Sequence, residues 1–207
     1  ERGPKHARAG GKLGVAARDF CLIFVVCVVC HGTRHSRVNE GAKEIKKLLE
    51  QFAQAQQVLL GLCAVEPDAD AAVRFRHLAV RMRSMLHNRR KPSLLVTSSI
   101  SGEGKTTVSC NLAIALASIA PECRVALVDL DLHRGRVSNV MDYSGKIGSE
   151  DVLRGDVSLS DACVETEFPA LDFYPVCHPV QDAHGLLGGA AERTLQNIHA
   201  RYDYVIC

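Results

Sequence analysis

Residues 93–107 read SLLVTSSISGEGKTT, a short apolar run followed by a glycine-containing loop that ends in Lys-Thr-Thr. The segment from Ser99 to Thr106 matches the phosphate-binding pattern G-x-x-x-x-G-K-[ST] except at its first position, where serine replaces glycine. Glycines in such a loop let backbone N–H groups turn toward phosphate oxygens, and the positive end of the following helix adds to the attraction. The stretch predicts a phosphate-binding loop between a buried strand and a helix.

The loop also supplies candidate ligands for a nucleoside triphosphate and its metal ion. Lys105 can reach the β- and γ-phosphates, and the Thr106 hydroxyl can bind Mg²⁺. ATP and Mg²⁺ are therefore the expected cofactors. The predicted nucleotide contacts are Ser101, Gly102, Glu103, Gly104, Lys105, Thr106, Thr107 and Arg134.

A second apolar run, residues 124–129, predicts another buried strand that ends in the acids Asp129 and Asp131. Acids at i and i+2 at the exit of a strand point the same way, so both can face a metal ion and the γ-phosphate. The alternative is that one acid caps the next turn and the other is solvated. The two acids join Lys105 as candidate catalytic groups and Thr106 as candidate metal ligands.

From Ser93 onward, short apolar runs alternate with helical stretches, which is typical of β-α-β units wound into a mostly parallel sheet. Such sheets bind ligands at the carboxyl ends of their strands. The pattern predicts an α/β fold of the P-loop, Rossmann-like kind with flanking helices. The expected strands are 93–97, 124–129, 171–176 and 204–207, and the expected helices are 105–120, a short one starting at 151–153, and 190–201.

The N-terminal part divides into a tail, residues 1–38, and a helical region, residues 39–91, ahead of the nucleotide-binding domain at 92–207. Helical periodicity is present at 39–62 and again at 70–86. The run Phe20–Cys30 has 11 apolar residues, whereas a membrane-spanning helix needs about 20. It is either the end of a membrane anchor or a buried strand upstream of the domain.

Composition limits the function classes only weakly. The chain has 207 residues and a formal net charge of +2, so no summed field indicates a nucleic-acid partner. The nine cysteines lie in apolar segments. This placement favours small buried hydrophobes in a reducing compartment over a disulfide framework.

Several motifs in order resemble the cytoplasmic domain of the bacterial tyrosine kinases that control capsule and exopolysaccharide export. The motifs are LLVTSSISGEGKTT, VALVDLDLHRGR, GSEDVLRGDVSLSDA, LDFYPV and RYDYVI, within residues 75–207. In that family the first is Walker A, the D-x-D acids form Walker A′, and RYDYVI leads into Walker B. The resemblance implies that Lys105 and Thr106 bind ATP·Mg²⁺, and that Asp129 and Asp131 hold the metal ion and help activate a tyrosine hydroxyl.

The resemblance also implies partners and a location. It implies a membrane polysaccharide co-polymerase as partner, a homo-oligomer, and a cytoplasmic location at the inner face of the bacterial membrane. The alternatives are a MinD/ParA-like ATPase switch without kinase activity, and a catalytically weak regulatory partner of the co-polymerase. Partitioning and division-site ATPases carry a signature lysine five residues before the P-loop lysine, where this sequence has Ile100, so the switch is the lesser expectation.

Some positions depart from the kinase pattern. After the D-x-D acids, His133 replaces the first of two arginines and Gly135 replaces a proline. In the E-x-x-R-x-x-R motif used for ring assembly, Val73 stands for the glutamate, Arg76 is retained, and Ala79 replaces the second arginine, which weakens the expectation of an oligomer.

The end of the sequence departs as well. The resemblance implies a Walker B aspartate directly after Ile206 and a tyrosine-rich tail, whereas the sequence has Cys207 and stops. We therefore expect an incomplete domain. Three of the four tyrosines, Tyr174, Tyr202 and Tyr204, lie in or beside expected strands, which favours core packing over a role as phosphate acceptors.

Overall fold

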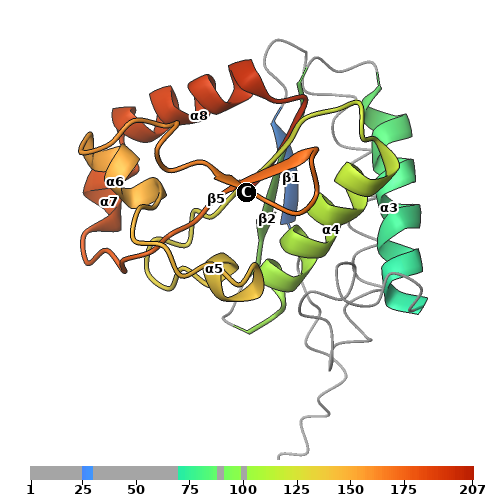
Figure 1. The fold of residues 1–207 in the computed structure, drawn as a ribbon, viewed down its shortest axis with the longest axis horizontal. Helices are drawn as coiled ribbons and strands as arrows, with labels where there is room; N and C mark the ends of the chain where they lie inside the picture. Colours follow the sequence, from blue (N-terminus) through green and yellow to red (C-terminus); the bar gives the residue numbers. More distant parts are fainter. Residues whose placement is uncertain (1–24, 30–69, 88–90, 99–101) are drawn as a thin grey trace, which may run out of the picture.

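The computed structural model describes residues 25–29, 70–87, 91–98 and 102–207, and they form one six-stranded sheet with helices on both faces (Figure 1). The strand order is β1-β2-β6-β3-β5-β4. The central four strands are parallel, and β1 and β4 pair antiparallel at the two edges. The strands are β1 Val25–Val29, β2 Ser93–Thr97, β3 Val125–Val128, β4 Val164–Glu165, β5 Leu171–Tyr174 and β6 Tyr204–Ile206.

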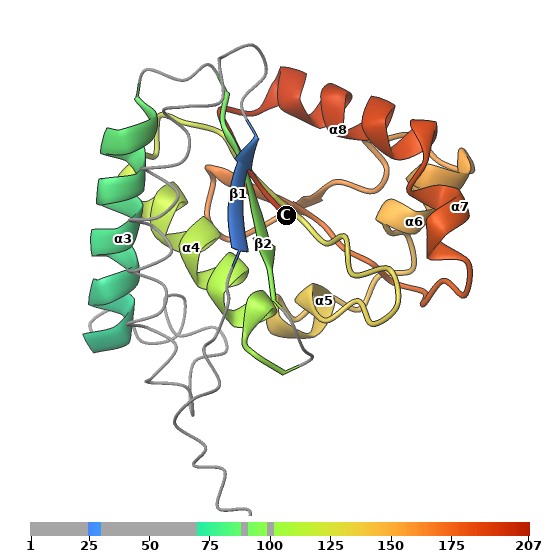
Figure 2. The same cartoon turned by 180° about the vertical axis from the view of Figure 1, so that it is seen from behind.

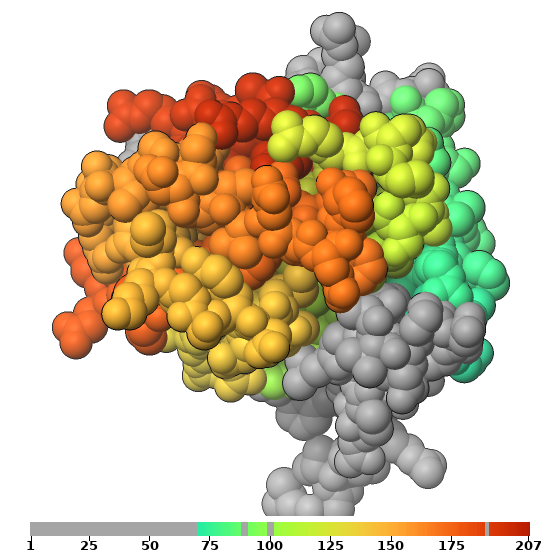
Figure 3. Space-filling view, in the orientation of Figure 1, coloured from blue at the N-terminus to red at the C-terminus, as the bar shows by residue number. Residues whose placement is uncertain are grey.

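Two long helices cover one face, and α8 covers the other together with the short helices α6 and α7 (Figures 1 and 2). In Figure 3 the segment around β4 and β5, in orange, lies at the centre of the visible surface, below α8 in red. The helices are α3 Asp70–Leu86, α4 Lys105–Ile119, α5 Val137–Val140, α6 Ser149–Arg154, α7 Ala183–Leu186 and α8 Gly189–Arg201.

Strands β3, β5 and β6 are buried on both faces, because side chains that alternate along each of them enter different clusters, whereas Leu95 of β2 is 38% exposed. In β3, Val125 and Leu127 pack with α3 and α4, whereas Ala126 and Val128 pack with Ile198 of α8. Helix α4 lies between the sheet and α3, and its residues 108–117 are all buried. Because α4 packs against the sheet on one side and α3 on the other, it is apolar all round. The loop before α4 is therefore attached to a buried helix.

The structure confirms the α/β fold and the four expected parallel strands. Helix α3 has the bounds that its periodicity predicted. The run Phe20–Cys30 includes β1, which pairs with β2 from Val25↔Thr97 to Val29↔Ser93, as the strand interpretation of this run expected. The expected helix 39–62 lies outside the described residues, as does the tail apart from β1. Within the described part of the chain, no helix combines the length and apolar character needed to cross a membrane.

Three short elements, α5, β4 and α7, were missed, because two to four residues carry too little periodicity. The cysteine prediction held in part. Cys110 is buried, and four other described cysteines are half-buried and unbridged. Ala79, at the position of the second arginine of the assembly motif, is fully buried in the core, so the chain cannot present a surface arginine there without displacing core packing.

A cluster of polar side chains connects the amino-terminal ends of β3, β5 and β6. It is far from the glycine loop in the sequence. Tyr202, which is 2% exposed, donates a hydrogen bond to Asp172 Oδ2 at 2.8 Å, and its hydroxyl lies 3.0 Å from that of Tyr174. Arg124 stacks over the Tyr202 ring and pairs with Asp172 at 3.1 Å. The buried tyrosines therefore serve core packing, as predicted for Tyr174 and Tyr202.

Removing the Tyr202 hydroxyl should destabilise the fold without affecting nucleotide binding. We expect Tyr202→Phe to lower the free energy of unfolding by about 1–2 kcal/mol, because the Tyr174 hydroxyl stays buried and loses its partner. Urea unfolding followed by circular dichroism measures this change. Tyr204→Phe is the control, since Tyr204 is half-buried at the start of β6. This substitution should lower the free energy of unfolding by less. Equal stability of both variants would contradict this role.

Candidate nucleotide-binding site

The two described glycines of the loop have left-handed backbone conformations. Gly102 and Gly104 both have φ of +89°, in the left-handed region that favours glycine. Gly104 is the N-cap of α4 and carries no side-chain cap, so the first N–H groups of the helix have no side-chain acceptor at that position. Ser101, predicted as a nucleotide contact, lies outside the described residues together with 99 and 100.

Lys105 begins α4 and folds back over the loop. Its Nζ donates to Ser98 Oγ at 2.9 Å, directly after β2, so the ammonium lies above the start of the loop. A Cβ built on Gly102 would meet no atom within 4 Å, which leaves open space on that side of the loop. Open space, an ammonium group and a helix N-terminus together fit a bound phosphate.

The remaining predicted loop contacts follow in the first turn of α4. Thr106 and Thr107 are half-buried, and Glu103 is 8% exposed. Ser109, one turn later, donates from its hydroxyl to the Lys105 and Thr106 carbonyls at 2.9 and 3.2 Å. These carbonyls are thus held inside the helix, and the threonine side chains remain the available oxygen ligands of this turn.

Asp129 and Asp131 have different environments. Asp129 follows β3 directly and is 5% exposed, and its carboxylate accepts N–H bonds from Asp131 at 2.9 Å and Val137 at 3.2 Å. Asp131 is exposed. This is the alternative arrangement that the sequence left open, in which one acid caps the following turn and the other is solvated.

Asp129 nevertheless lies close to the first turns of α4. Burial raises the pKa of the Cys110 thiol in α4 to about 12, and the negative charge of Asp129 contributes to this increase. Cys110 follows Thr106 by one helical turn, so the carboxylate and the loop approach the same helix end. Strand β6 lies between β2 and β3, which separates the two halves of the candidate site by one strand.

The register of β6 fixes the position of Cys207. Leu127 pairs with Ile206, so Cys207 lies level with Val128 and not with Asp129. Cys207 N donates to Leu94 O at 2.8 Å, and Val96 N donates to Cys207 O at 2.7 Å. Cys207 is therefore hydrogen-bonded within the sheet, between the strand that precedes the glycine loop and the strand that precedes Asp129. It lies one residue before the level of Asp129.

Burial of Asp129 predicts a pH-dependent stability in the absence of nucleotide and metal. Burial is the largest cause that raises the pKa of Asp129 from 3.8 to about 6, and its two backbone hydrogen bonds oppose that rise. The folded state thus favours the protonated acid. The contribution of the protonated Asp129 to the free energy of unfolding is complete below about pH 3.8 and is lost as the pH rises through 6. The free energy of unfolding changes by an amount on the order of 3 kcal/mol over this range.

The measurement is the free energy of unfolding at a series of pH values between 4 and 7. We expect Asp129→Asn to lack the decline that the unchanged protein shows over this range. Asp131→Asn is the control, since Asp131 is exposed and its variant should keep the decline. Parallel curves for the protein and Asp129→Asn would contradict the buried environment of this carboxyl.

The turn after Asp131 requires glycine where the kinase pattern has proline. Gly135 has φ of +48°, and a Cβ there would lie 2.7 Å from Val176 O. The Arg134 and Gly135 N–H groups both bond to Asp131 O, at 3.0 and 2.9 Å. Arg134, the predicted phosphate contact, is exposed on this turn. The turn therefore holds Arg134 at the same edge of the sheet as Asp129.

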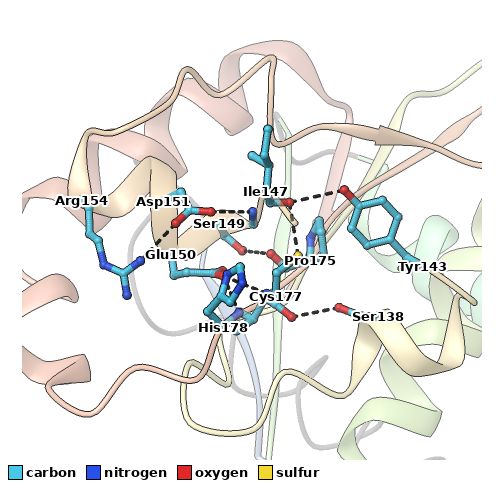
Figure 4. A network of polar contacts seen from close by, with 12 residues as sticks. Ser138, Tyr143, Ile147, Ser149, Glu150, Asp151, Arg154, Pro175, Cys177 and His178 are labelled. Carbon is cyan, nitrogen blue, oxygen red and sulfur yellow. Dashed lines mark hydrogen bonds and ion pairs between the residues drawn. The ribbon is translucent and has the colours of Figure 1, made fainter. Parts of the chain in front are cut away.

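Sequence reasoning missed a polar network beside this edge, at the start of α6 (Figure 4). Ser149 donates from Oγ to Pro175 O at 2.7 Å, and the same hydroxyl lies 3.3 Å from Asp129 O. Glu150, the next residue, is fully buried. A Ser-Glu-Asp string after glycine predicts a helix start, but nothing in it shows that one acid turns inward.

Fold and site together define a P-loop nucleotide-binding α/β domain. Residues 94–200 match the family model described as the CobQ/CobB/MinD/ParA nucleotide binding domain, and the chain belongs to this family. Its motifs resemble those of the bacterial tyrosine kinases of capsule and exopolysaccharide systems, and several relatives carry such names, whereas ParA of Caulobacter vibrioides, 33% identical over 124 residues, is named a chromosome partitioning protein. The tyrosine-protein kinase CpsD of Streptococcus agalactiae is 29% identical over 130 residues, covering 62% of this chain and 56% of CpsD.

Two further comparisons agree with this assignment. EpsB of Ralstonia nicotianae is 28% identical over 141 residues, covering 68% of this chain and 18% of EpsB. The kinase domain of the Escherichia coli tyrosine kinase ETK superposes with a TM-score of 0.63 and 25% identity, covering 74% of this chain and 60% of that domain. The chain thus spans about half of CpsD and less than a fifth of EpsB.

Proposed function

We propose that this domain belongs to an ATP-dependent protein-tyrosine kinase that regulates the polymerisation and export of capsule or exopolysaccharide. The observation that carries the proposal is the glycine loop with Lys105 at the N-terminus of α4, close to the buried Asp129. The family binds nucleotides, and relatives named as tyrosine kinases match across most of the described domain.

In this proposal each predicted residue has a role in phosphoryl transfer. Backbone N–H groups from Gly102 to Thr107 and the Lys105 ammonium hold the β- and γ-phosphates of ATP. Thr106, Asp129 and Asp131 hold Mg²⁺, which neutralises the charge that develops on the phosphoryl oxygens. Asp129 or Asp131 accepts the proton of the attacking tyrosine hydroxyl, and the exposed Asp131 is the more accessible of the two.

The described tyrosines narrow the choice of acceptor. Tyr174 and Tyr202 are 1% and 2% exposed, so neither hydroxyl can reach a bound nucleotide without unfolding the core. Tyr143 is half-buried, with its ring edge on Phe173. The acceptor we propose is therefore a tyrosine of another polypeptide.

The partner, assembly and location follow from the same proposal. We infer a membrane polysaccharide co-polymerase as partner, a cytoplasmic position at the inner face of the bacterial membrane, and no nucleic-acid partner. Self-association, if it uses α3, must rely on contacts other than an arginine at position 79, because Ala79 is buried.

The test is incubation of the protein with γ-labelled ATP and Mg²⁺, followed by separation of phosphotyrosine from free phosphate. A kinase transfers label to tyrosine of the protein or of an added tyrosine-rich peptide, and Lys105→Met abolishes the transfer. Free phosphate without labelled tyrosine supports the second candidate, a MinD/ParA-like ATPase switch, since the description of the family model names MinD and ParA. Nucleotide binding without either product supports a regulatory module and contradicts an enzyme.

A further inference from the structure

Glu150, Asp151 and His178 bring three potential metal ligands together outside the proposed nucleotide site. One ligand atom of each residue lies within 4.8 Å of those of the other two. Glu150 and Asp151 open α6, and His178 comes from the loop after β5, so two separate segments converge (Figure 4). His178 is exposed and Asp151 is half-buried, which leaves the cluster accessible from solvent.

Glu150 is the anomalous member of the cluster. Its side chain has no exposed surface, and it points toward Cys177 and His178 (Figure 4). Oε1 accepts the N–H groups of Cys177 at 2.9 Å and His178 at 2.6 Å, whereas Oε2 is buried and has no hydrogen-bond partner. A buried carboxylate with an unpaired oxygen is costly unless a cation compensates it.

The positions of the donor atoms already approach those of a metal site. His178 Nδ1 lies 3.3 Å from Glu150 Oε1. Ligands on a tetrahedral ion with bonds near 2.1 Å lie about 3.4 Å apart, so the imidazole and the Glu150 carboxyl group already lie at a suitable separation. Because Oε1 accepts two N–H groups, Oε2 is the Glu150 oxygen that can coordinate an ion. The exposed imidazole can rotate and the half-buried Asp151 can shift to bring the widest pair within that separation. Imidazole nitrogen and carboxylate oxygen are both ligands that Zn²⁺ accepts in proteins.

Cys177, Arg154 and Gly148 contact or lie beside the acids of the cluster. Burial raises the pKa of the Cys177 thiol to about 11, with further contributions from the negative charges of Glu150 and Asp151. Arg154 pairs with Asp151 Oδ1 at 3.1 Å and Gly148 N donates to Asp151 Oδ2 at 3.0 Å. Each Asp151 oxygen has a second lone pair, so these bonds do not prevent coordination by Asp151.

We propose that Glu150, Asp151 and His178 form a binding site for a transition-metal ion of the zinc class, separate from the Mg²⁺ site proposed at the glycine loop. An imidazole ligand favours Zn²⁺ over Mg²⁺, which prefers oxygen and retains water. The ion would fasten the start of α6 to the loop after β5. Ser149 connects this region to Asp129 O, so the site borders the nucleotide edge of the sheet.

The experiment is zinc titration of EDTA-treated protein in excess Mg²⁺ and without nucleotide, followed by calorimetry and by bound zinc per chain. We expect His178→Ala to lose one equivalent of zinc, or to weaken that equivalent at least about tenfold, as ligand losses do. Asp151→Asn should weaken the same equivalent. His184→Ala and Asp156→Asn are matched controls, because both residues are exposed nearby and lie outside the cluster.

A second readout separates a metal site from a simple ion pair between His178 and Glu150. We expect zinc to raise the unfolding temperature of the protein and of Lys105→Met alike, but not that of His178→Ala. The Lys105→Met variant keeps this test independent of the proposed kinase function. Equal zinc stoichiometry and affinity in His178→Ala and His184→Ala would overturn the proposal, as would the absence of a zinc-dependent thermal shift in the unchanged protein.

Discussion

Lys105→Met should lower the affinity for Mg²⁺·ATP by about 10- to 150-fold, the equivalent of losing a charged hydrogen bond of 1.5–3 kcal/mol. In the described part of the chain, the ammonium donates a hydrogen bond to Ser98 Oγ at 2.9 Å, and the lysine itself begins α4. Methionine keeps the length of the side chain and removes its charge. Calorimetric titration with Mg²⁺·ATP measures the change.

The control is Lys146→Met, which removes an exposed lysine of the segment between α5 and α6 and should leave the affinity unchanged. Circular dichroism should give both variants the spectrum of the unchanged protein, since neither lysine is in the core. If Lys105→Met bound Mg²⁺·ATP as tightly as Lys146→Met, the loop would not be the phosphate site.

Gly135→Ala should produce the largest loss of stability of any alanine substitution considered for this chain. The new Cβ would lie 2.7 Å from Val176 O and 3.0 Å from Val176 Cγ1, at a residue whose φ is +48°. Backbone strain and overpacking together cost about 3 kcal/mol. Thermal unfolding should show a midpoint lower by roughly 6–12 °C for a chain of this size.

Gly155→Ala is the matched control, because it separates strain from steric contact. Gly155 has φ of +88°, but a Cβ there would meet no atom within 4 Å. Its substitution should therefore cost only the strain, about 1 kcal/mol. Equal losses of stability in the two variants would contradict the close approach of Gly135 to Val176. The close approach would then not explain why glycine stands at position 135, where the kinase pattern has proline.

The sequence predicted the elements whose patterns are long or chemically distinctive. Helix α3 and the strands β2, β3, β5 and β6 were predicted because continuous apolar runs and helical periodicity mark them clearly. The glycine loop was predicted because few other arrangements place Lys-Thr after such a turn. Strand β1 pairs with β2 about 70 residues later, so the sequence alone left its strand interpretation open, and β4 was missed because it has only two residues.

The roles of the candidate site residues stay predictions, but their places in the fold can be compared with the sequence. Lys105 and Thr106 begin α4 and Asp129 follows β3, as the expected helix and strand placed them. The spacing of Asp129 and Asp131 did not reveal that the first is buried under backbone N–H groups and the second exposed. The inward turn of Glu150 was missed because it depends on N–H groups of Cys177 and His178, 27 and 28 residues later in the chain. Such tertiary contacts leave no local signal.

Hydrogen exchange of backbone amides, with and without Mg²⁺·ATP, tests the central claim most directly. The nucleotide should slow exchange at the amides of residues 102–107, because phosphate oxygens accept them, and to a lesser degree at 129–137, which follow β3. Amides of β4 and of the Tyr202 cluster should exchange as before. Unchanged exchange at 102–107 while ATP binds elsewhere would contradict the assignment of the nucleotide site to the start of α4.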